Sequence, residues 1–340
     1  MRWLLGIVIV ATVLWFGYWF AATTAIRNGV DGFLADQRAS GTLIETRDVS
    51  VQGFPYRFDL TLDGLKLKDP VSGAGYEGEK LQVSAMAWKP WHILAALPPD
   101  QVLTVAGQEI ELTGTELMAS LRARPALDLP LEELRLGGQA IGLSSSAGWQ
   151  SGASNLLLAL RQAETGPADY ALALSAGGVK IDPAFGARLA AVALPNQPPP
   201  GMPDEAGPLR ANILLHFTAP LDRNYAAVQP RFTGLDIGEL HLEWGALVIE
   251  ATGKLAADAE GYAAGEVKLT VTNWDRLPPV LVALGLVKPE VAPTIGNMMK
   301  ALAGQTGDPE LLQLPLKLAD GQMSLGPFPL GPAPLLMPRS

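Results

Sequence analysis

Residues 53–60, GFPYRFDL, place a proline between two aromatic residues and then alternate apolar with polar side chains. A period of two is typical of a β-strand, because successive side chains of a strand point to opposite faces. Proline has no amide hydrogen, so Pro55 fits the start of a strand, an edge or a bulge. The pattern predicts a strand on which Phe54, Tyr56 and Phe58 share one face and anchor the sheet to a preceding helix. A patch that stacks on a ligand is the alternative.

The same alternation recurs along most of the chain from about residue 42, with turn residues between the apolar runs. The 36 glycines and 28 prolines suit many short connections. We therefore predict a mainly β protein, with a curved antiparallel sheet or open barrel of short strands, an N-terminal transmembrane helix and a few short helices. The predicted turns include Asp63-Gly64, Ala106-Gly107, Glu260-Gly261 and Asp320-Gly321.

The N-terminal run, residues 3–22, WLLGIVIVATVLWFGYWFAA, contains no charged residue. Its length matches the roughly 20 residues that a helix needs to cross the hydrocarbon core of a bilayer. Arg2 precedes the run, so the positive-inside rule places the N-terminus in the cytoplasm. Aromatic side chains are enriched at membrane interfaces; a cluster of them, Trp15, Tyr18, Trp19 and Phe20, falls near the far end of this run, and Trp3 lies near the other end.

Two alternatives to a retained signal anchor stay open. A cleavable signal peptide has an apolar region of about 7 to 15 residues and a small-residue cleavage site. The run here is longer, and Thr23-Thr24-Ala25 is a weak match to such a site. A buried helix of a cytosolic protein agrees less well with the unbroken length and the aromatic placement. We expect a single-pass protein of the bacterial inner membrane, with the bulk of the chain in the periplasm.

The chain divides by pattern into an anchor, a short helix and two β-rich halves joined by a proline-rich linker. The prolines of the linker cannot donate hydrogen bonds to a sheet, so we predict a boundary there. The second half contains an insertion, residues 275–306, that predicts two short amphipathic helices, 278–287 and 293–302. The apolar face of the second helix is Ile295, Met298, Met299 and Leu302. The predicted parts are 1–22 (anchor), 23–40 (juxtamembrane helix), 41–192, 193–208 (linker) and 209–340.

Motifs for chemistry are weak throughout the sequence. A net charge of −9 argues against nucleic acid as a partner, and the absence of cysteine excludes disulfides and thiolate metal sites. His92, His216 and His241 are far apart, without the spacing of a metal site or a catalytic triad. The run Ser144-Ser145-Ser146 is not part of a nucleophile elbow. We predict no catalytic residue, no cofactor and no metal.

Residues 86–92, MAWKPWH, bring two tryptophans close together in the sequence. Such a segment either caps a core or forms an amphipathic patch that touches the membrane interface. Trp88 and Trp91 therefore join Trp15, Tyr18 and Trp19 as candidate membrane-interface residues.

The apolar excess is the main functional signal. The chain is 48% hydrophobic and only 17% charged, below the roughly 25% of ordinary soluble domains. Runs such as 155–160 and 209–217 are partly apolar on both faces, as in strands that pack helices on one side and a second sheet or a lipid on the other. The candidate residues for lining an apolar-ligand site are Leu60, Leu62, Leu158, Leu269 and Val271.

These observations favour an envelope protein that is not an enzyme and that binds or shelters phospholipid or another lipid. The alternative is a scaffold with a fully packed sheet that binds an envelope protein partner through an edge strand or the helices of residues 275–306. An enzyme ranks third, because it needs His216 or His241 to meet acidic partners in a cleft.

Several stretches resemble an uncharacterised bacterial envelope family, domain of unknown function 2125. They are GFPYRFDL, Trp88-Lys-Pro-Trp91, residues 271–287 (VTNWDRLPPVLVALGLV) and residues 314–331 (LPLKLADGQMSLGPFPLG). The likeness covers nearly the whole chain and implies no known catalytic residue. More loosely, an inner-membrane anchor followed by many short strands resembles the AsmA-type envelope proteins, which implies a curved sheet with an apolar groove for lipids.

Overall fold

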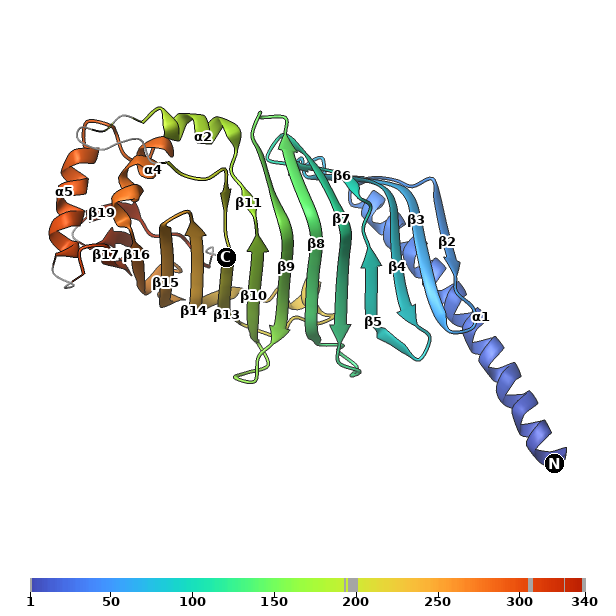
Figure 1. The fold of residues 1–340 in the computed structure, drawn as a ribbon. Helices are drawn as coiled ribbons and strands as arrows, with labels where there is room; N and C mark the ends of the chain where they lie inside the picture. Colours follow the sequence, from blue (N-terminus) through green and yellow to red (C-terminus); the bar gives the residue numbers. More distant parts are fainter. Residues whose placement is uncertain (1, 193, 195–200, 305–307, 327, 338–340) are drawn as a thin grey trace.

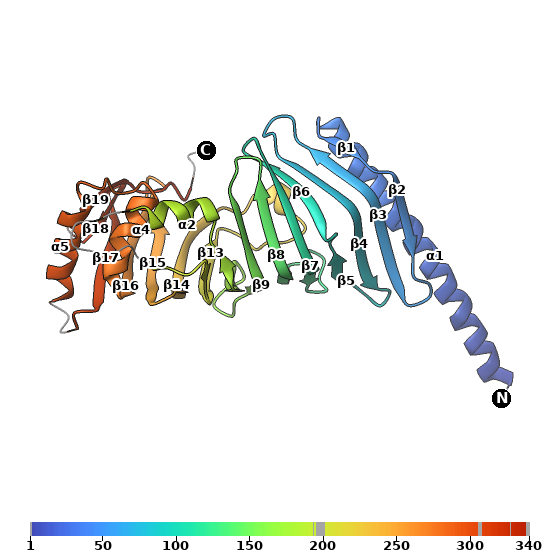
Figure 2. The same ribbon diagram turned by 45° about the horizontal axis from the view of Figure 1, so that its top comes forward.

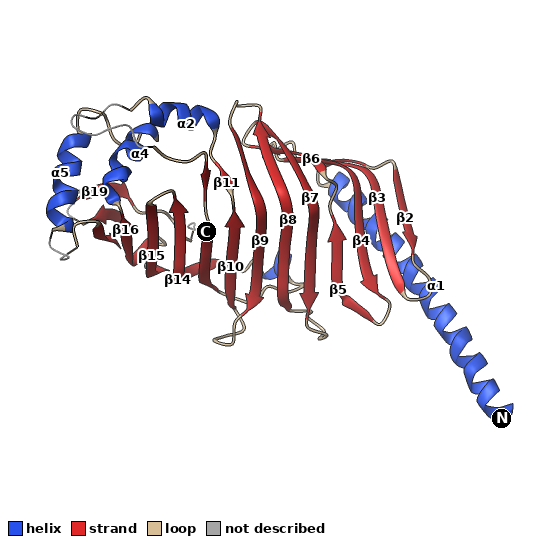
Figure 3. Ribbon diagram, in the orientation of Figure 1, coloured by secondary structure: helices blue, strands red, loops and turns tan. Residues whose placement is uncertain are grey.

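The computed structural model describes residues 2–192, 194, 201–304, 308–326 and 328–337. Strands dominate these residues, as the alternation predicted (Figures 1 and 3). The first strands are β1 Leu43–Glu45, β2 Asp48–Gln52, β3 Arg57–Lys68, β4 Gly75–Met86, β5 Lys89–Ala96, β6 Asp100–Val105, β7 Gln108–Ala123, β8 Leu131–Ser145, β9 Gln150–Gln162 and β10 Asp169–Gly177. The later strands are β11 Val179–Lys180, β12 Glu205–Ala206, β13 Leu209–Phe217, β14 Phe232–Trp244, β15 Leu247–Ala257, β16 Ala263–Thr272, β17 Leu311–Ala319, β18 Gln322–Leu325 and β19 Phe328–Pro332. The helices are α1 Arg2–Ala39, α2 Pro183–Ala190, α3 Tyr225–Val228, the 3₁₀ turn η1 Trp274–Arg276, α4 Leu277–Ala283 and α5 Ala292–Ala303.

The strands form one long antiparallel sheet rather than a barrel (Figures 1 and 2). At one edge β1 and β2 pair with the two halves of β3, and β3 pairs with β4. Both β5 and β6 lie between β4 and β7. From β7 the order runs through β8, β9, β10, β13, β14, β15, β16, β17 and β18 to β19 at the other edge.

Strands on both sides of the predicted linker belong to this same sheet. Strand β10 pairs with β13, and β11 pairs with β12, which itself lies within residues 193–208. Residues 193 and 195–200 of the linker lie outside the described residues. The two β-rich halves therefore join edge to edge within the described part of the chain.

The predicted anchor and juxtamembrane helix are a single helix, α1, of 38 residues. Its C-terminal part packs on the sheet, where the buried Leu34 contacts Ile44, Leu62 and Leu65. Its N-terminal part projects beyond the sheet (Figure 1). One helix therefore connects the apolar N-terminal run to the sheet without an intervening turn.

The segment GFPYRFDL begins with a turn, and the strand begins later than predicted. The N–H groups of Tyr56 and Arg57 both donate to the carbonyl oxygen of Gly53, at 3.2 and 2.9 Å, and β3 begins at Arg57. Tyr56 is consequently exposed, while Phe54 and Phe58 contact α1. The predicted anchoring of the sheet to the first helix is confirmed, but through Phe54 and Phe58 only.

The predicted turn at Asp63-Gly64 is wrong, because β3 runs straight through it. Gly64 adopts a φ of +63°, in the left-handed region that favours glycine. This irregularity interrupts the period of two, so that Leu62 and Leu65, three positions apart, are both buried against α1. The turns predicted at Ala106-Gly107 and Asp320-Gly321 do connect consecutive strands.

The predicted helical insertion is present as η1, α4 and α5. Helix α4 ends earlier than predicted, just before Gly285, whose φ of +74° is typical of the residue that terminates a helix. On α5, Met299 is buried and Ile295 and Leu302 are half-buried, whereas Met298 is 37% exposed and does not share the predicted apolar face fully.

The longer helices cover the two ends of one face of the sheet, and the single-turn helix α3 lies over part of the middle. Phe58 of β3 contacts Trp19 of α1 at one end. At the other end Val271 of β16 and Leu312 of β17 pack with residues of α4 and α5. The cross-strand register places all of these strand residues on the same face. We call this the helix face, and we call the other side of the sheet the polar face.

Candidate functional site

An unbroken row of leucine and isoleucine side chains crosses the helix face between its two helical ends. Each member lies directly opposite the next on the neighbouring strand. At about 4.8 Å between neighbouring strands, the row is about 29 Å long. We call it the aliphatic row, and its residues are Ile93, Leu121, Leu134, Leu160, Leu172, Ile213 and Ile237.

A second row lies beside the first, two residues away on each strand except β14, where a bulge makes the separation three residues. It consists of four leucines and three alanines: Ala95, Ala119, Leu136, Leu158, Leu174, Ala211 and Leu240. The two rows together form a surface without a polar side chain, which we call the aliphatic strip.

The aliphatic strip is only half covered. Leu121 is 39% exposed and Leu136 is 38% exposed, and of the fourteen side chains only Ala211 is buried. The hydrophobic clusters of the described residues lie under α1, under the C-terminal helices and at the β16–β19 end, and no member of the strip belongs to them. A sheet face of this kind is normally packed against another layer.

A connecting segment, residues 218–231 with α3, crosses the helix face near one end of the strands. The N–H of Leu221 donates to the hydroxyl of Tyr170 at 2.8 Å, and its carbonyl accepts from the N–H of Leu131 at 2.8 Å. Between this segment and the strip lies a pocket of about 400 Å³. Its walls include Trp91, Ile93, Leu121, Leu131, Leu221 and Tyr225.

The five predicted lining residues all lie on the helix face. Leu158 is part of the aliphatic strip and is half-buried. Leu62 is buried beneath α1, and Leu60 is half-buried beside it on β3. Leu269 and Val271 belong to the cluster beneath the C-terminal helices. The structure thus brings Leu158 to the open surface and places Leu62, Leu269 and Val271 under helices.

The predicted interface aromatics of α1 bind the sheet rather than standing free. The indole N–H of Trp15 donates to the carbonyl of Pro55 at 3.1 Å, and that of Trp19 donates to the carbonyl of Arg57 at 3.1 Å. Trp19 is only 7% exposed, and its ring stacks on Phe58 at a centroid distance of 6.0 Å.

Tyr18 bridges the same helix to the next hairpin. Its hydroxyl donates to the carbonyl of Ala87, in the turn between β4 and β5, at 2.8 Å. Trp88 in that turn is 51% exposed, whereas Trp91 is half-buried and lines the pocket. The structure therefore separates the two tryptophans that the sequence suggested as one patch.

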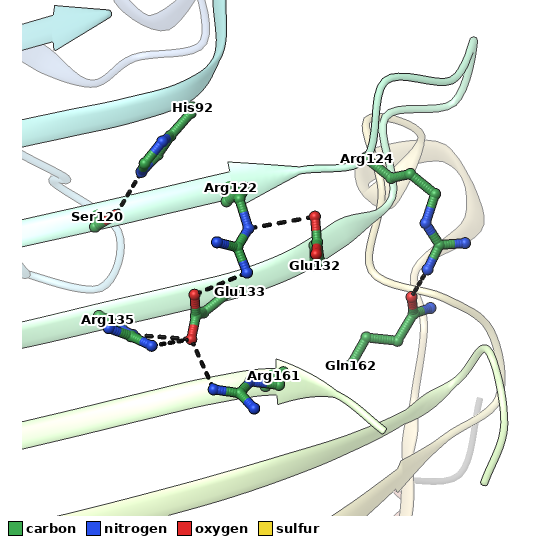
Figure 4. Close-up of polar contacts among 9 residues, drawn as sticks. All are labelled: His92, Ser120, Arg122, Arg124, Glu132, Glu133, Arg135, Arg161 and Gln162. Atoms are coloured by element: carbon green, nitrogen blue, oxygen red, sulfur yellow. Dashed lines mark hydrogen bonds and ion pairs between the residues drawn. The ribbon is translucent and has the colours of Figure 1, made fainter. Parts of the chain in front are cut away.

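The polar face carries the charged side chains of the central strands. Glu133, only 7% exposed at its side chain, lies among three arginines: its carboxylate is 2.6 Å from Arg135, 3.1 Å from Arg122 and 3.3 Å from Arg161 (Figure 4). Burial raises the pKa of Glu133, but hydrogen bonds from Arg135 and Arg161 and the charge of Arg122 outweigh burial and hold it below the ordinary value. The arginines themselves cover Glu133, so the cluster joins three strands electrostatically.

Two of the three histidines meet acidic residues on this polar face. His216 Nδ1 lies 2.8 Å from Asp169, and His241 Nε2 lies 2.8 Å from Glu243. The hydrogen bond with Glu243 raises the pKa of His241. His92 instead contacts the Ser120 hydroxyl at 3.2 Å, and within the described residues no carboxylate bonds its other nitrogen.

These contacts are cross-strand or same-strand pairs on a sheet surface, and within the described residues neither His216 nor His241 bonds a serine or threonine. The same part of the chain contains no group of three or more histidine, aspartate or glutamate residues arranged to hold a metal ion.

Comparison with known proteins identifies the family. The model of the DUF2125 family, uncharacterised proteins conserved in bacteria, matches residues 19–334. The chain belongs to the DUF2125 family. No curated protein and no solved structure matches it, so the looser resemblance to AsmA-type envelope proteins stays a prediction.

None of the seven residues of the aliphatic row of this DUF2125 protein was among the predicted lining residues. Leu134, Leu160, Leu172, Ile213 and Ile237 each occur in a run that was predicted as a strand. The signal that was present is the leucine or isoleucine at alternate positions of several strands. Which of those positions lie opposite one another depends on register, and register is set by turns and bulges that the sequence does not specify.

Proposed function

We propose that this protein is a membrane-anchored envelope protein that binds the acyl chains of lipids along its aliphatic strip and catalyses no reaction. The observation that carries the proposal is the unbroken row of leucine and isoleucine over seven neighbouring strands, which lies between the helix-covered ends of the sheet and is crossed by a single connecting segment.

The size and chemistry of the strip suit an acyl chain. Transfer of apolar surface out of water contributes about 25 cal/mol per Å² and needs no directional contact. One leaflet of a bilayer is about 15 Å thick in its hydrocarbon part, so a row of about 29 Å accommodates a fully extended chain along the sheet. The three alanines of the second row leave shallow space beside the larger side chains of the first.

The proposal includes α1 as a retained anchor of the inner membrane, with the sheet in the periplasm. The helix is long and apolar enough to span a bilayer. Cleavage after residue 22 would remove Trp15 and Trp19 and expose Phe58 and Ala87, which are buried against them. Loss of contacts with a buried tryptophan is costly, so the packing favours retention over cleavage.

Site-specific crosslinking in the native membrane tests the proposal. A photoreactive amino acid replaces Leu158 on the strip or, as the matched control, Leu157 on the polar face of the same strand. Leu157 is 51% exposed, so if exposure alone determined crosslinking, position 157 would form more lipid adduct than position 158. We expect a lipid adduct, seen by mass spectrometry of the intact protein, at position 158 and none at 157.

Two other results would contradict lipid binding. Equal lipid adducts at both positions indicate non-specific contact with exposed leucines. A protein adduct at 158 in place of lipid supports the scaffold alternative, in which an envelope partner covers the strip.

A further inference from the structure

Helix α1 contacts the sheet close to its N-terminus. If the whole sheet stayed in water, too few residues would precede these contacts to span a bilayer. The first is made by Trp15, which bonds Pro55, and the next by Phe16, whose ring lies 4.6 Å from that of Phe54. Residues 2–14 precede these contacts, and at about 1.5 Å per residue they span about 20 Å.

The hydrocarbon core of a bilayer is about 30 Å thick, so residues 2–14 leave about 10 Å uncovered. Any tilt of the helix increases the shortfall. The apolar run supplies the missing length in residues 15–22, which are also the residues beside the turns of the sheet. The same helical segment cannot lie in the membrane while the turns beside it lie in bulk water.

The turns at this depth present apolar side chains outward. Tyr56 is 65% exposed and Phe54 is 41% exposed in the turn before β3. Trp88 is 51% exposed and Met86 is 43% exposed around the turn between β4 and β5. Such aromatic side chains, apolar with a polar edge, are those enriched at the membrane interface.

A basic side chain directly follows the exposed aromatic residue of each of the two turns. Arg57, whose side chain is 58% exposed, follows Tyr56, and the exposed Lys89 follows Trp88. Long basic side chains extend toward phosphate groups while their stems stay in apolar surroundings. At the opposite end of strands β3 and β4 the turn differs, because Asp69 there accepts hydrogen bonds from Val71 and Ser72.

We infer that the turns of residues 53–56 and 86–88 insert into the outer leaflet of the same bilayer that α1 spans. This membrane contact depends on the proposed anchor but not on lipid binding along the strip. It has one consequence for the strip: Phe58 begins the line of paired residues that continues through Ala85 and Ile93 into the aliphatic row. The strip therefore starts at the bilayer surface, and its lipids are those of the outer leaflet of that membrane.

Single-cysteine labelling of the full-length protein tests the inference, because the chain has no cysteine of its own. The variants Tyr56→Cys and Trp88→Cys carry a nitroxide at the two turn tips. Val71→Cys, 94% exposed at the opposite end of the same hairpin, is the aqueous control, and Val10→Cys in the apolar run of α1 is the membrane control. Each variant is reconstituted in phosphatidylethanolamine–phosphatidylglycerol vesicles.

We expect labels at positions 56 and 88 to show several-fold higher accessibility to oxygen, relative to a water-soluble nickel complex, than the label at 71. All substituted side chains are exposed, and circular dichroism of each variant verifies that the sheet is intact.

Three results would overturn the inference. If the label at position 10 is in lipid while the labels at positions 56 and 88 are as accessible to the nickel complex as the label at 71, the turns stay in water although α1 spans the membrane. If position 10 is also in water, the anchor itself fails. If the label at position 71 is as accessible to oxygen as the labels at positions 56 and 88 and all three are in lipid, the sheet lies flat on the bilayer. Lipid adducts at Leu158 are measured separately, so the function and the membrane contact fail independently.

Discussion

Replacement of Trp19 by alanine should detach α1 from the sheet more than any other single change in the helix. Trp19 is 7% exposed, stacks on Phe58 and donates a hydrogen bond of 3.1 Å to the carbonyl of Arg57. Truncation of a buried tryptophan to alanine costs about 3 to 5 kcal/mol, and the lost hydrogen bond accounts for about 1 kcal/mol of that.

The loss converts into a measurable shift of the melting temperature. Unfolding entropy is about 2.1 cal/mol/K per residue, or about 0.7 kcal/mol/K for a chain of this length, so Trp19→Ala should lower the melting temperature by about 4 to 7 °C. Trp19→Phe keeps an aromatic ring but loses the hydrogen bond and part of the buried ring volume, so it should lose about 1 to 3 kcal/mol and melt about 1 to 4 °C below the parent.

The assay is thermal unfolding of the full-length protein in detergent micelles, followed by circular dichroism of the strands. Trp3→Ala is the matched control, since Trp3 lies on the same helix and is 88% exposed. Its substitution should change stability by no more than about 0.5 kcal/mol. If Trp19→Ala and Trp3→Ala melt at the same temperature, α1 does not stabilise the sheet, and the argument for a retained anchor loses its structural support.

Three further predictions follow from other parts of the sheet. Leu158→Asp should reduce the lipid that copurifies with the protein, measured by mass spectrometry of organic extracts, whereas Leu157→Asp on the polar face should not. Glu133→Gln should lower the free energy of unfolding by about 2 kcal/mol at neutral pH. Because the pKa of Glu133 is lowered, that loss should shrink as the pH falls through it, and a loss independent of pH would contradict the ionic account. The hydrogen bond with Glu243 raises the pKa of His241, so its stabilisation is fully present below the ordinary histidine pKa of about 6.5 and is lost as the pH rises through the raised pKa. His241→Gln should remove this dependence of stability on pH above about 6.5, as measured by thermal unfolding at several pH values.

The sequence predicts local structure here far better than it predicts which strands meet. Alternation identified the strands, and the proline-started amphipathic patterns identified α4 and α5 to within a few residues. Both signals are local, because they depend on the periods of a strand and a helix. The prediction of a turn at Asp63-Gly64 was wrong because a glycine with positive φ occurs both in hairpin turns and in irregular strands. Only the packing of the strand against α1 distinguishes the two cases here.

The sequence predicted that aliphatic strand residues would form the candidate site, but it did not predict which of these residues lie on the open surface. Leu158 and Val271 have the same sequence signature, an aliphatic residue in an alternating strand, yet one lies on the open strip and the other lies beneath helices. The difference comes from where α1, α4 and α5 pack, which involves residues far away in the sequence. The contacts of Trp15, Tyr18 and Trp19 with the sheet were hidden for the same reason, since a membrane belt and a packing interface require the same aromatic residues.

The asymmetry of the two faces argues that the open strip has an occupant. The polar face carries the Glu133 cluster and the acidic pairs of His216 and His241, and its exposed apolar side chains, Leu94, Met118 and Leu157, interrupt a charged surface. The helix face between α1 and the C-terminal helices has no charge in either row. Full burial of a leucine side chain contributes about 1.5 to 3 kcal/mol to stability relative to exposure. Because the leucines of the strip are only partly buried, each contributes less than this. A sheet that packs helices on both ends of one face and leaves the middle only partly covered loses stability that a further helix would have supplied. In the proposed function, lipid from the adjoining leaflet recovers this stability, because the inferred membrane contact places the start of the strip at the bilayer surface.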